Sequence, residues 1–489
     1  MSQIKRITAK SIKINYLYNL VYEVFAVIAP LITTPYISRV LEPEGVGIYS
    51  FTYSIAQYFV IVGNLGISIS GQMKIAEARD DIYKTSKIFY ELFILKVITV
   101  SVSILIYLTI SFNATSYRTA RIILGMFVFA SVFDVSWFFR GIENFSKVVF
   151  RDVFVKVLMI IMIFTFVKTR EDVNIYILLI AASALLGNLT YLISLKKLLV
   201  KVPINELRVF EHFRSSLVFF IPTIATSVYT ILDKTMLGWL TGNAIENGYY
   251  EQAHKIEQIL LLIITSLNTI MRSRMTYLFG QGNYEEMRKK LKNSLSLILF
   301  LSIGMSAGLI GTAKVLIPLF LGDGFFKCVA LLRIFSLLLI VIGISNCLNT
   351  HFLGPSGRQG KNNIVLILGA LINALCNYIV IPKYGAIGAA CASVLAEMII
   401  LCGYLFLACD FYNPVGLFTA GWRYLTAGII MSICVTYLGE CIQLEAIIKL
   451  LLQIIVGCVI YLLIILILKD TFLIEFTKNI KETLLKKRR

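Results

Sequence analysis

The chain has 489 residues, of which 58% are hydrophobic and only 15% are charged, and its formal net charge is +18. Soluble domains carry roughly 25% charged residues, so this composition excludes a soluble globular protein and requires lipid as the solvent. A positive balance can indicate nucleic-acid binding, but here the basic residues lie mostly between apolar runs. We therefore expect no nucleic-acid partner and interpret the basic residues as topology signals.

The apolar runs are continuous and each is about 20 residues long, which is the length that spans a bilayer as a helix. Strands of a membrane barrel would instead alternate in polarity over roughly ten residues. The runs fall at 14–38, 48–70, 88–111, 118–139, 148–167, 173–195, 215–240, 249–271, 293–320, 327–350, 363–381, 385–409, 421–438 and 447–468. The sequence therefore predicts an all-α integral membrane protein with about fourteen transmembrane helices.

The distribution of Lys and Arg predicts the orientation of these spans. With the N-terminus in the cytoplasm, the cytoplasmic segments hold 32 of the 46 basic residues and the external segments hold eight. Such a bias is the positive-inside signal, and it places both termini in the cytoplasm. The basic N-terminal stretch lacks a convincing cleavage site, so we interpret 14–38 as an uncleaved first span.

A faint internal repeat divides the spans. P-x-I-x-T occurs at Pro30 and again at Pro222, and G-x-Y-x5-I-x-Q occurs at Gly47 and again at Gly248. The two motifs fall in spans one and two and recur in spans seven and eight. We therefore predict two six-helix lobes, 1–200 and 201–410, followed by a helix pair and a basic tail in 411–489. Parallel repeats of this kind form transporters whose substrate binds between the lobes.

Many ionisable residues interrupt the apolar runs, and each costs about 2.5–3.5 kcal/mol at a helix centre, so such residues usually face a cavity or a partner. The cations would attract an anionic substrate. The predicted substrate-binding residues are Arg39, Lys96, Arg140, Lys156, Lys234, Lys255, Lys314 and Arg333. The predicted coupling or gating residues are Glu23, Asp134, Asp233, Glu251, His254, Glu257 and Glu397.

Structural roles compete with these predictions. Glu251 and Lys255 have the i,i+4 spacing of a helix-stabilising pair, and Lys255 could extend to an interface. Asp233 and Lys234 could form a pair at the rim, and Arg39 and Arg140 could be topology anchors. Glu23, Asp134 and Glu397 could bind a coupling proton or cation, or could pair with Lys96 or Lys156. His254 is more readily interpreted as a polar wall residue than as a proton switch.

The sequence contains no motif typical of ATP hydrolysis, metal-dependent proteolysis or serine hydrolase catalysis. There is no GxxxxGK[ST], HExxH or GxSxG sequence. The nine cysteines all lie at or beyond Cys328 without metal-ligand spacing, which favours apolar packing roles. We therefore expect no catalytic residues, no metal and no cofactor, and predict that the chain is not an enzyme.

Several stretches of the chain resemble one family of membrane transporters. They are PYISRVL (35–41), GVGIYS (45–50), SIAQYF (54–59), IAEARDD (75–81), WFFRGIE (137–143), Arg151, Lys156, DKTMLG (233–238), GYYEQAHKI (248–256), IPKYGAIGAA (381–390) and Glu397. Together they resemble the Wzx-type O-antigen and capsule repeat-unit flippases of the MOP (MATE-like) superfamily. MRSRM (271–275) departs from this pattern, because it lacks a proline expected near the end of span eight.

The resemblance implies a function. A similar protein moves an oligosaccharide on undecaprenyl pyrophosphate across the bacterial cytoplasmic membrane by alternating access, with a proton or cation as a coupling ion. The implied partners are this lipid-linked oligosaccharide, membrane lipids, and a polysaccharide polymerase with its chain-length regulator. A lipid II flippase and a MATE-type antiporter are the alternatives, and a membrane glycosyltransferase or polymerase is disfavoured because the chain has no long external loop.

Overall fold

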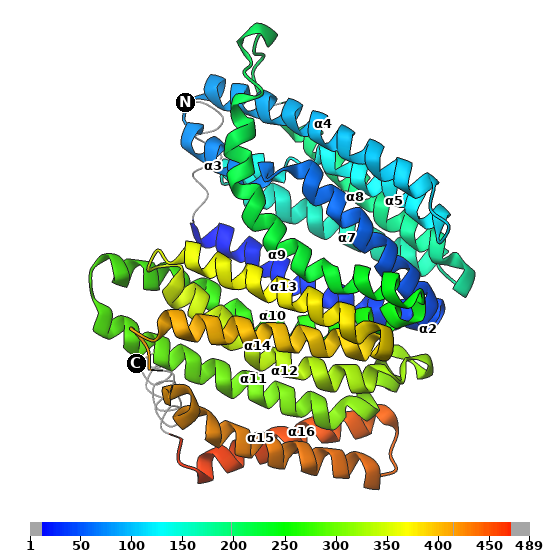
Figure 1. Ribbon diagram of the computed structural model, residues 1–489, viewed down its shortest axis with the longest axis vertical. Helices are drawn as coiled ribbons and strands as arrows, with labels where there is room; N and C mark the ends of the chain where they lie inside the picture. The colour runs from blue at the N-terminus through cyan, green and yellow to red at the C-terminus, as the bar shows by residue number, and fades with distance from the viewer. Residues whose placement is uncertain (1–11, 197, 414, 471–489) are drawn as a thin grey trace. The chain divides into compact units, whose positions relative to one another are not determined.

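The computed structural model describes residues 12–196, 198–413 and 415–470, and these residues form helices and short connections without a strand (Figure 1). The prediction of an all-α protein is therefore confirmed. The basic residues of 1–11 and the basic tail 471–489, which support the predicted orientation, lie outside the described residues, as does the side chain of Glu23. The chain forms two compact units, Met1–Gly248 and Tyr249–Arg489. The division into two six-helix lobes stays a prediction.

Among the described residues, ten helical segments are long and apolar enough to cross a membrane. An eleventh is counted if the two parts of α10, which are bent by 41° relative to each other, form one span. The chain is thus a multi-pass membrane protein, whereas the count of fourteen stays a prediction. The difference lies in α2, which covers two predicted spans, and in two helices that are not counted. These are α7, whose apolar run contains Arg151, Asp152 and Lys156, and α9.

The helix α2 illustrates how one element contains two spans. It covers Ile12–Asn64, and 53 residues of helix would extend about 80 Å, more than twice the thickness of a hydrocarbon core. Glu42 has φ 56° and ψ −179°, so the helix is broken there, and Pro43 follows directly. Proline is well suited to the first turn of a helix because it has no N–H to leave unsatisfied.

The first unit contains α2 and the helices that pack around it. These are α3 (Ile67–Ala78), α4 (Ile82–Phe112), α5 (Arg118–Ala130), η1 (Ser131–Phe133), α6 (Ser136–Gly141), α7 (Phe145–Phe166), η2 (Arg170–Asp172), α8 (Val173–Leu195), η3 (Ile204–Glu206) and α9 (Glu211–Thr241). The helix α2 packs against α4, α5, α7 and α9, and α3 packs against α4, α6 and α9.

The second unit contains most of α10 (Ala244–Gly280) and all later helices. These are α11 (Tyr284–Leu321), η4 (Asp323–Phe325), α12 (Cys328–Leu348), η5 (Asn349–Leu353), α13 (Gln359–Tyr384), α14 (Ala386–Ala408), α15 (Val415–Cys441) and α16 (Ala446–Ile467). The last two helices lie side by side and both pack on α11 (Figure 1). They correspond to the predicted C-terminal helix pair.

Two segments that lie between predicted spans are largely helical. Within 71–87, α3 continues to Ala78 and α4 begins at Ile82, and within 272–292, α10 continues to Gly280 and α11 begins at Tyr284. The apolar run marks only the part of a helix that contacts lipid, because a helix can extend into water with polar side chains. The helices on either side of these two positions therefore extend beyond the predicted apolar runs.

An aromatic core in the first unit holds α3 in place. Trp137, Phe138 and Phe139 of α6 are fully buried, and Phe89 of α4 stacks on the Trp137 ring at 5.6 Å. Gly71 of α3 lies against the same indole, since a Cβ added there would be 2.6 Å from its Cε3 atom. This close approach fixes the helical turn of α3 that carries Lys74.

Candidate functional site

A break in the fourth span organises the buried charges of the first unit. After α5 and η1, Asp134 has an extended backbone (φ −73°, ψ 91°) before α6 begins. A broken helix leaves carbonyl groups without helical partners, and in lipid each must find another. Lys96 of α4, which is 0% exposed, donates a hydrogen bond from Nζ to the Asp134 carbonyl oxygen at 2.7 Å.

The Asp134 carboxylate also contributes to this break. Its Oδ1 accepts the Ser136 backbone N–H at 3.1 Å, which caps α6, and it attracts the Lys96 ammonium electrostatically. Of the two alternatives for Asp134, coupling or pairing with Lys96, this geometry favours pairing. A second contact supports the break, because Asn188 of α8 donates from Nδ2 to the Ala130 carbonyl oxygen at 2.8 Å.

Arg151 of α7 extends this polar core. Its guanidinium donates to Gly187 O at 2.9 Å, to Asn188 Oδ1 at 2.5 Å and to Asp152 Oδ1 at 2.5 Å. It also lies 4.8 Å from the centre of the Tyr191 ring. The predicted cation Lys156 lies one turn further along α7, partly exposed and attracted by Asp152. Asp152 and Asn188 are therefore structural members of this core that the sequence analysis did not single out.

Two predicted cations of the first unit lie on its surface. Arg39 of α2 is exposed and donates to the Pro35 carbonyl oxygen in its own helix at 3.3 Å. Arg140 of α6 is also exposed. Neither guanidinium is enclosed by the core of this unit, so both are accessible to a ligand or to solvent.

Asp233 and Lys234 lie on α9 beside α2. Asp233 is buried and interacts electrostatically with Tyr58. In the same layer, Thr235 donates from Oγ1 to Ser54 Oγ at 2.9 Å. The Lys234 carbonyl oxygen accepts from Asn247 Nδ2 at 2.6 Å, which connects α9 to the start of α10. The first unit thus has a polar layer between α2 and α9.

The predicted residues of α10 occupy successive turns in the second unit. Glu251 and Lys255 form an ion pair of 3.3 Å, as their i,i+4 spacing predicts. Glu257 is 0% exposed, and its Oε2 lies 3.9 Å from His254 Nε2 and accepts from Gln258 at 3.1 Å. Its Oε1 has no hydrogen-bond partner among the residues that the structure describes. Such a buried, half-satisfied carboxyl group costs about 1–3 kcal/mol or more, so its persistence suggests a function.

The remaining predicted residues of the second unit are dispersed. Lys314 of α11 is exposed and forms an ion pair of 2.6 Å with Glu440 of α15. Arg333 of α12 donates from Nε to the Ile310 carbonyl oxygen at 3.3 Å. Glu397 of α14 is partly exposed and acts electrostatically on Glu257. Among the described residues, no group of three His, Cys, Asp or Glu side chains could hold a metal ion.

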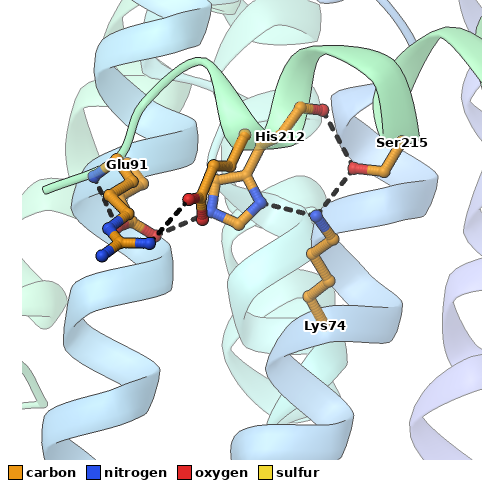
Figure 2. Close-up of polar contacts among 6 residues, drawn as sticks. Lys74, Glu91, His212 and Ser215 are labelled. Carbon is orange, nitrogen blue, oxygen red and sulfur yellow. Dashed lines mark hydrogen bonds and ion pairs between the residues drawn. The ribbon is translucent and has the colours of Figure 1, made fainter.

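The first unit also contains a charged cluster that the sequence analysis missed. Lys74 of α3, Glu91 of α4 and His212 of α9 lie in a continuous chain of hydrogen bonds, with Ser215 beside them (Figure 2). Lys74 and His212 lie outside the predicted spans, where Lys74 counts only as a topology signal and His212 is not counted. A pairing between helices more than 100 residues apart leaves no local sequence pattern.

Comparison with known proteins assigns the family. The family described as "Polysaccharide biosynthesis protein" matches residues 12–271, and the MatE family matches residues 219–379. The chain belongs to the polysaccharide biosynthesis protein family. A proposed O-antigen transporter of Escherichia coli (strain K12) is 23% identical over 395 residues, which cover 80% of this chain and 95% of that protein. One of Shigella dysenteriae is 22% identical over 376 residues, covering 76% and 93%.

Solved structures agree on the fold of this family member. The lipid II flippase MurJ in an inward closed conformation matches with a TM-score of 0.73 at 15% identity, covering 92% of this chain and 97% of MurJ. An outward-facing MATE family multidrug transporter of the MOP superfamily matches with a TM-score of 0.56 at 14% identity, covering 88% and 99%. The polysaccharide biosynthesis family match and this shared fold agree with the resemblance to Wzx-type flippases that the sequence motifs indicate.

Proposed function

We propose that this flippase moves oligosaccharide repeat units linked to undecaprenyl pyrophosphate across the cytoplasmic membrane for surface polysaccharide synthesis. The observation that carries the proposal is the match to two proposed O-antigen transporters over 93–95% of their lengths. Their substrate would be a lipid-linked oligosaccharide whose pyrophosphate is an anion. The accessible guanidinium groups of Arg39 and Arg140 are chemically suited to such a group, because Arg binds phosphate oxygens with two parallel hydrogen bonds.

The headgroup would pass between two lobes by alternating access, with both termini in the cytoplasm and the lipid tail in the bilayer. The positive-inside distribution of Lys and Arg supports this orientation. In the proposal, Lys156, Lys234, Lys255 and Arg333 supply further positive charge along the path. Lys96 is fully buried against the broken fourth span, so it contributes mainly to the fold. Lys314, like Lys255, is paired with a carboxylate and would offer its charge when that pair opens. A polymerase and a chain-length regulator would receive the translocated unit.

A proton or cation would drive the transport cycle. Glu257 is the side chain best suited to bind this ion, because it is fully buried and its Oε1 has no hydrogen-bond partner in the described part of the chain. A proton on this carboxyl group would remove the cost of burying its charge. His254 and Glu397 would modulate this site from their positions near Glu257.

Lipid II flipping is the second candidate, and the fold match to MurJ favours it over drug transport. Deletion of the gene tests the proposal in cells without a second flippase. Surface glycan should disappear in the deletion strain and return with the wild-type gene. The charge-reversed variants Arg39→Glu, Asp233→Lys and Lys234→Glu should restore less glycan. Glycan export that persists in the deletion strain would show that the proposal is wrong.

A further inference from the structure

The hydrogen-bonded cluster of Lys74, Glu91 and His212 connects three helices of the first unit (Figure 2). Lys74 Nζ lies 2.5 Å from His212 Nδ1, and His212 Nε2 lies 2.7 Å from Glu91 Oε2. Glu91 and His212 are buried, with 4% and 9% of their surface exposed. These contacts link α3, α4 and the first turn of α9, and we refer to the three residues as the relay.

The hydrogen bonds of the relay determine where its protons lie. A Lys ammonium group has three donors and no acceptor, whereas a carboxylate only accepts. His212 Nδ1 must therefore accept from Lys74, and His212 Nε2 must donate to Glu91. Only the neutral imidazole with its proton on Nε2 satisfies both contacts. The relay thus contains a cation, a neutral ring and an anion in sequence.

The two ends of the relay, Lys74 Nζ and Glu91 Oε1, also have further hydrogen-bond partners. Lys74 donates a second hydrogen bond to Ser215 Oγ at 2.7 Å, and Ser215 in turn donates to the His212 carbonyl oxygen at 2.9 Å. Glu91 Oε1 accepts the Arg208 backbone N–H at 2.8 Å from the segment before α9. Both carboxylate oxygens of Glu91 are therefore occupied, and the neutral state of His212 completes the network.

Further contacts hold the same part of α9 against α3. Ser70 and Ser216 form a hydrogen bond of 3.1 Å between their hydroxyl groups. Gly66, at the start of α3, approaches so closely that an added Cβ would lie 2.5 Å from the Ser216 carbonyl oxygen. The position of the first turns of α9 therefore depends on the relay and on this close approach.

Charged side chains surround the relay on each of the three helices that it connects. On α3, Glu77 lies in electrostatic range of Lys74, and on α9, Glu211 does so too. The Arg208 guanidinium before α9 is paired with Glu211 at 3.0 Å. On α4, Glu91 itself is the charged group that contacts His212. A proton added to His212 would thus meet one carboxylate at Nε2 and the Lys74 ammonium at Nδ1.

We propose that the relay is a proton-binding site that holds the start of α9 against α3 and α4 when His212 is neutral. A proton that binds to Nδ1 removes the acceptor of Lys74 and places two cations in contact. The Lys74 ammonium then leaves, and the first turns of α9 separate from α3. Histidine is the side chain whose charge commonly changes between pH 5 and 8.

In the transport cycle, the relay would make the position of the start of α9 depend on pH. This part of the first unit lies on the side that the proposed orientation assigns to the cytoplasm. This consequence rests on the proposed function, whereas the proton-binding site itself does not. The polar layer of α9 with α2, around Thr235, lies several turns further along the helix. Movement at the start of α9 can therefore be compared with movement near Thr235, a part of the same helix that does not contact the relay.

Disulfide trapping in the full-length protein tests the proposal. The nine native cysteines are first replaced; none of them lies in the first unit. The pair Ser70→Cys and Ser216→Cys reports the contact beside the relay, and Ser54→Cys with Thr235→Cys is the matched control on the same helix. The ratio of their cross-linking rates cancels the effect of pH on thiol oxidation.

The ratio is expected to be severalfold lower at pH 5.5 than at pH 8. In the variant His212→Gln, whose amide donates to Glu91 and accepts from Lys74 without titrating, the ratio should stay constant. A constant ratio in the protein that retains His212, or an equal fall in the variant, would overturn the proposal. These measurements need no substrate, so they are independent of whether glycan is transported.

A second measurement avoids cysteine substitutions. Hydrogen exchange in the wild-type protein, corrected for the intrinsic effect of pH, should show that the backbone of 211–220 loses protection at pH 5.5. The buried part of α4 should keep its protection at both values. Equal protection of 211–220 at pH 8 and pH 5.5 would contradict the proposal, even if the cysteine variants fail to fold.

Discussion

Gly47 and Gly248, the first glycines of the two G-x-Y-x5-I-x-Q motifs, lie against each other's helix in a reciprocal contact. A Cβ added to Gly47 would lie 1.7 Å from the Ala244 carbonyl oxygen, and one added to Gly248 would lie 1.9 Å from the Pro43 carbonyl oxygen. Ala244 precedes Gly248 by four residues, as Pro43 precedes Gly47. The two glycines therefore make equivalent contacts, each with the carbonyl oxygen of the residue four positions before the other.

This contact predicts that neither glycine tolerates a side chain. Gly47→Ala and Gly248→Ala should each lower thermal stability and reduce export, because the obstructing atom is backbone and overpacking costs about 1–3 kcal/mol or more. Gly308→Ala in α11 is the control, since nothing lies within 4 Å of a Cβ there. Thermal unfolding in detergent measures the stability. Wild-type stability of both variants would contradict the close contact.

Lys96 and Arg39 should respond differently to loss of charge. Lys96→Met removes the donor to the Asp134 carbonyl oxygen in the broken span, so we expect a lower melting temperature and less protein in the membrane. Arg39→Gln should lower the melting temperature less than Lys96→Met does but reduce export about tenfold or more, because hydrogen bonds to a charged group contribute about 1.5–3 kcal/mol. Export and thermal unfolding of both variants separate the two roles, and an unstable Arg39→Gln variant would argue for a structural role.

Glu257 should determine how transport depends on pH. Replacement by Gln keeps the shape but removes the titrating group, so Glu257→Gln should transport at a rate that no longer changes with the proton gradient. The matched control is Glu251→Gln on the same helix, where the carboxylate is already paired with Lys255. Substrate flux into vesicles with and without a pH gradient measures the effect. A response of Glu257→Gln equal to that of wild type would exclude this residue as the coupling site.

The ion pair between Arg358 and Asp410 should stabilise the protein only above acidic pH. Arg358 donates from Nη1 to Asp410 Oδ1 at 2.8 Å, and these hydrogen bonds lower the pKa of the Asp410 carboxyl from its usual value of 3.8. A carboxyl with a lowered pKa contributes stability above the unfolded-state pKa and loses it as the pH falls through the folded-state pKa. Asp410→Asn should therefore lower the melting temperature slightly at pH 7.

The difference in melting temperature between wild type and Asp410→Asn should disappear as the pH falls below about 4. The effect is small because the Asp410 side chain is 58% exposed and water screens the pair. Thermal unfolding at a series of pH values measures it. A difference that grows toward acidic pH would contradict the assignment of the effect to this carboxylate.

The sequence predicts the membrane-embedded part of this fold well, because the bilayer imposes a length and an apolarity on every span. It also identifies Lys96 and Asp134 as special, since charges inside apolar runs are costly. It does not predict that a break in the fourth span brings these two together. His212 and Lys74 are missed for another reason: they lie beyond the apolar runs, on helices that extend past the lipid, where charges are common and distant partners leave no pattern.

The central claim is that the chain flips a lipid-linked oligosaccharide, and reconstitution tests it most directly. The purified protein is placed in vesicles containing fluorescent undecaprenyl-pyrophosphate oligosaccharide, and an impermeant quencher is added outside. We predict that the quencher reaches nearly all of the labelled lipid with the wild-type protein, but only the outer leaflet in protein-free vesicles or with Arg39→Glu. Quenching limited to the outer leaflet with active wild-type protein, or flipping of lipid II alone, would contradict the claim.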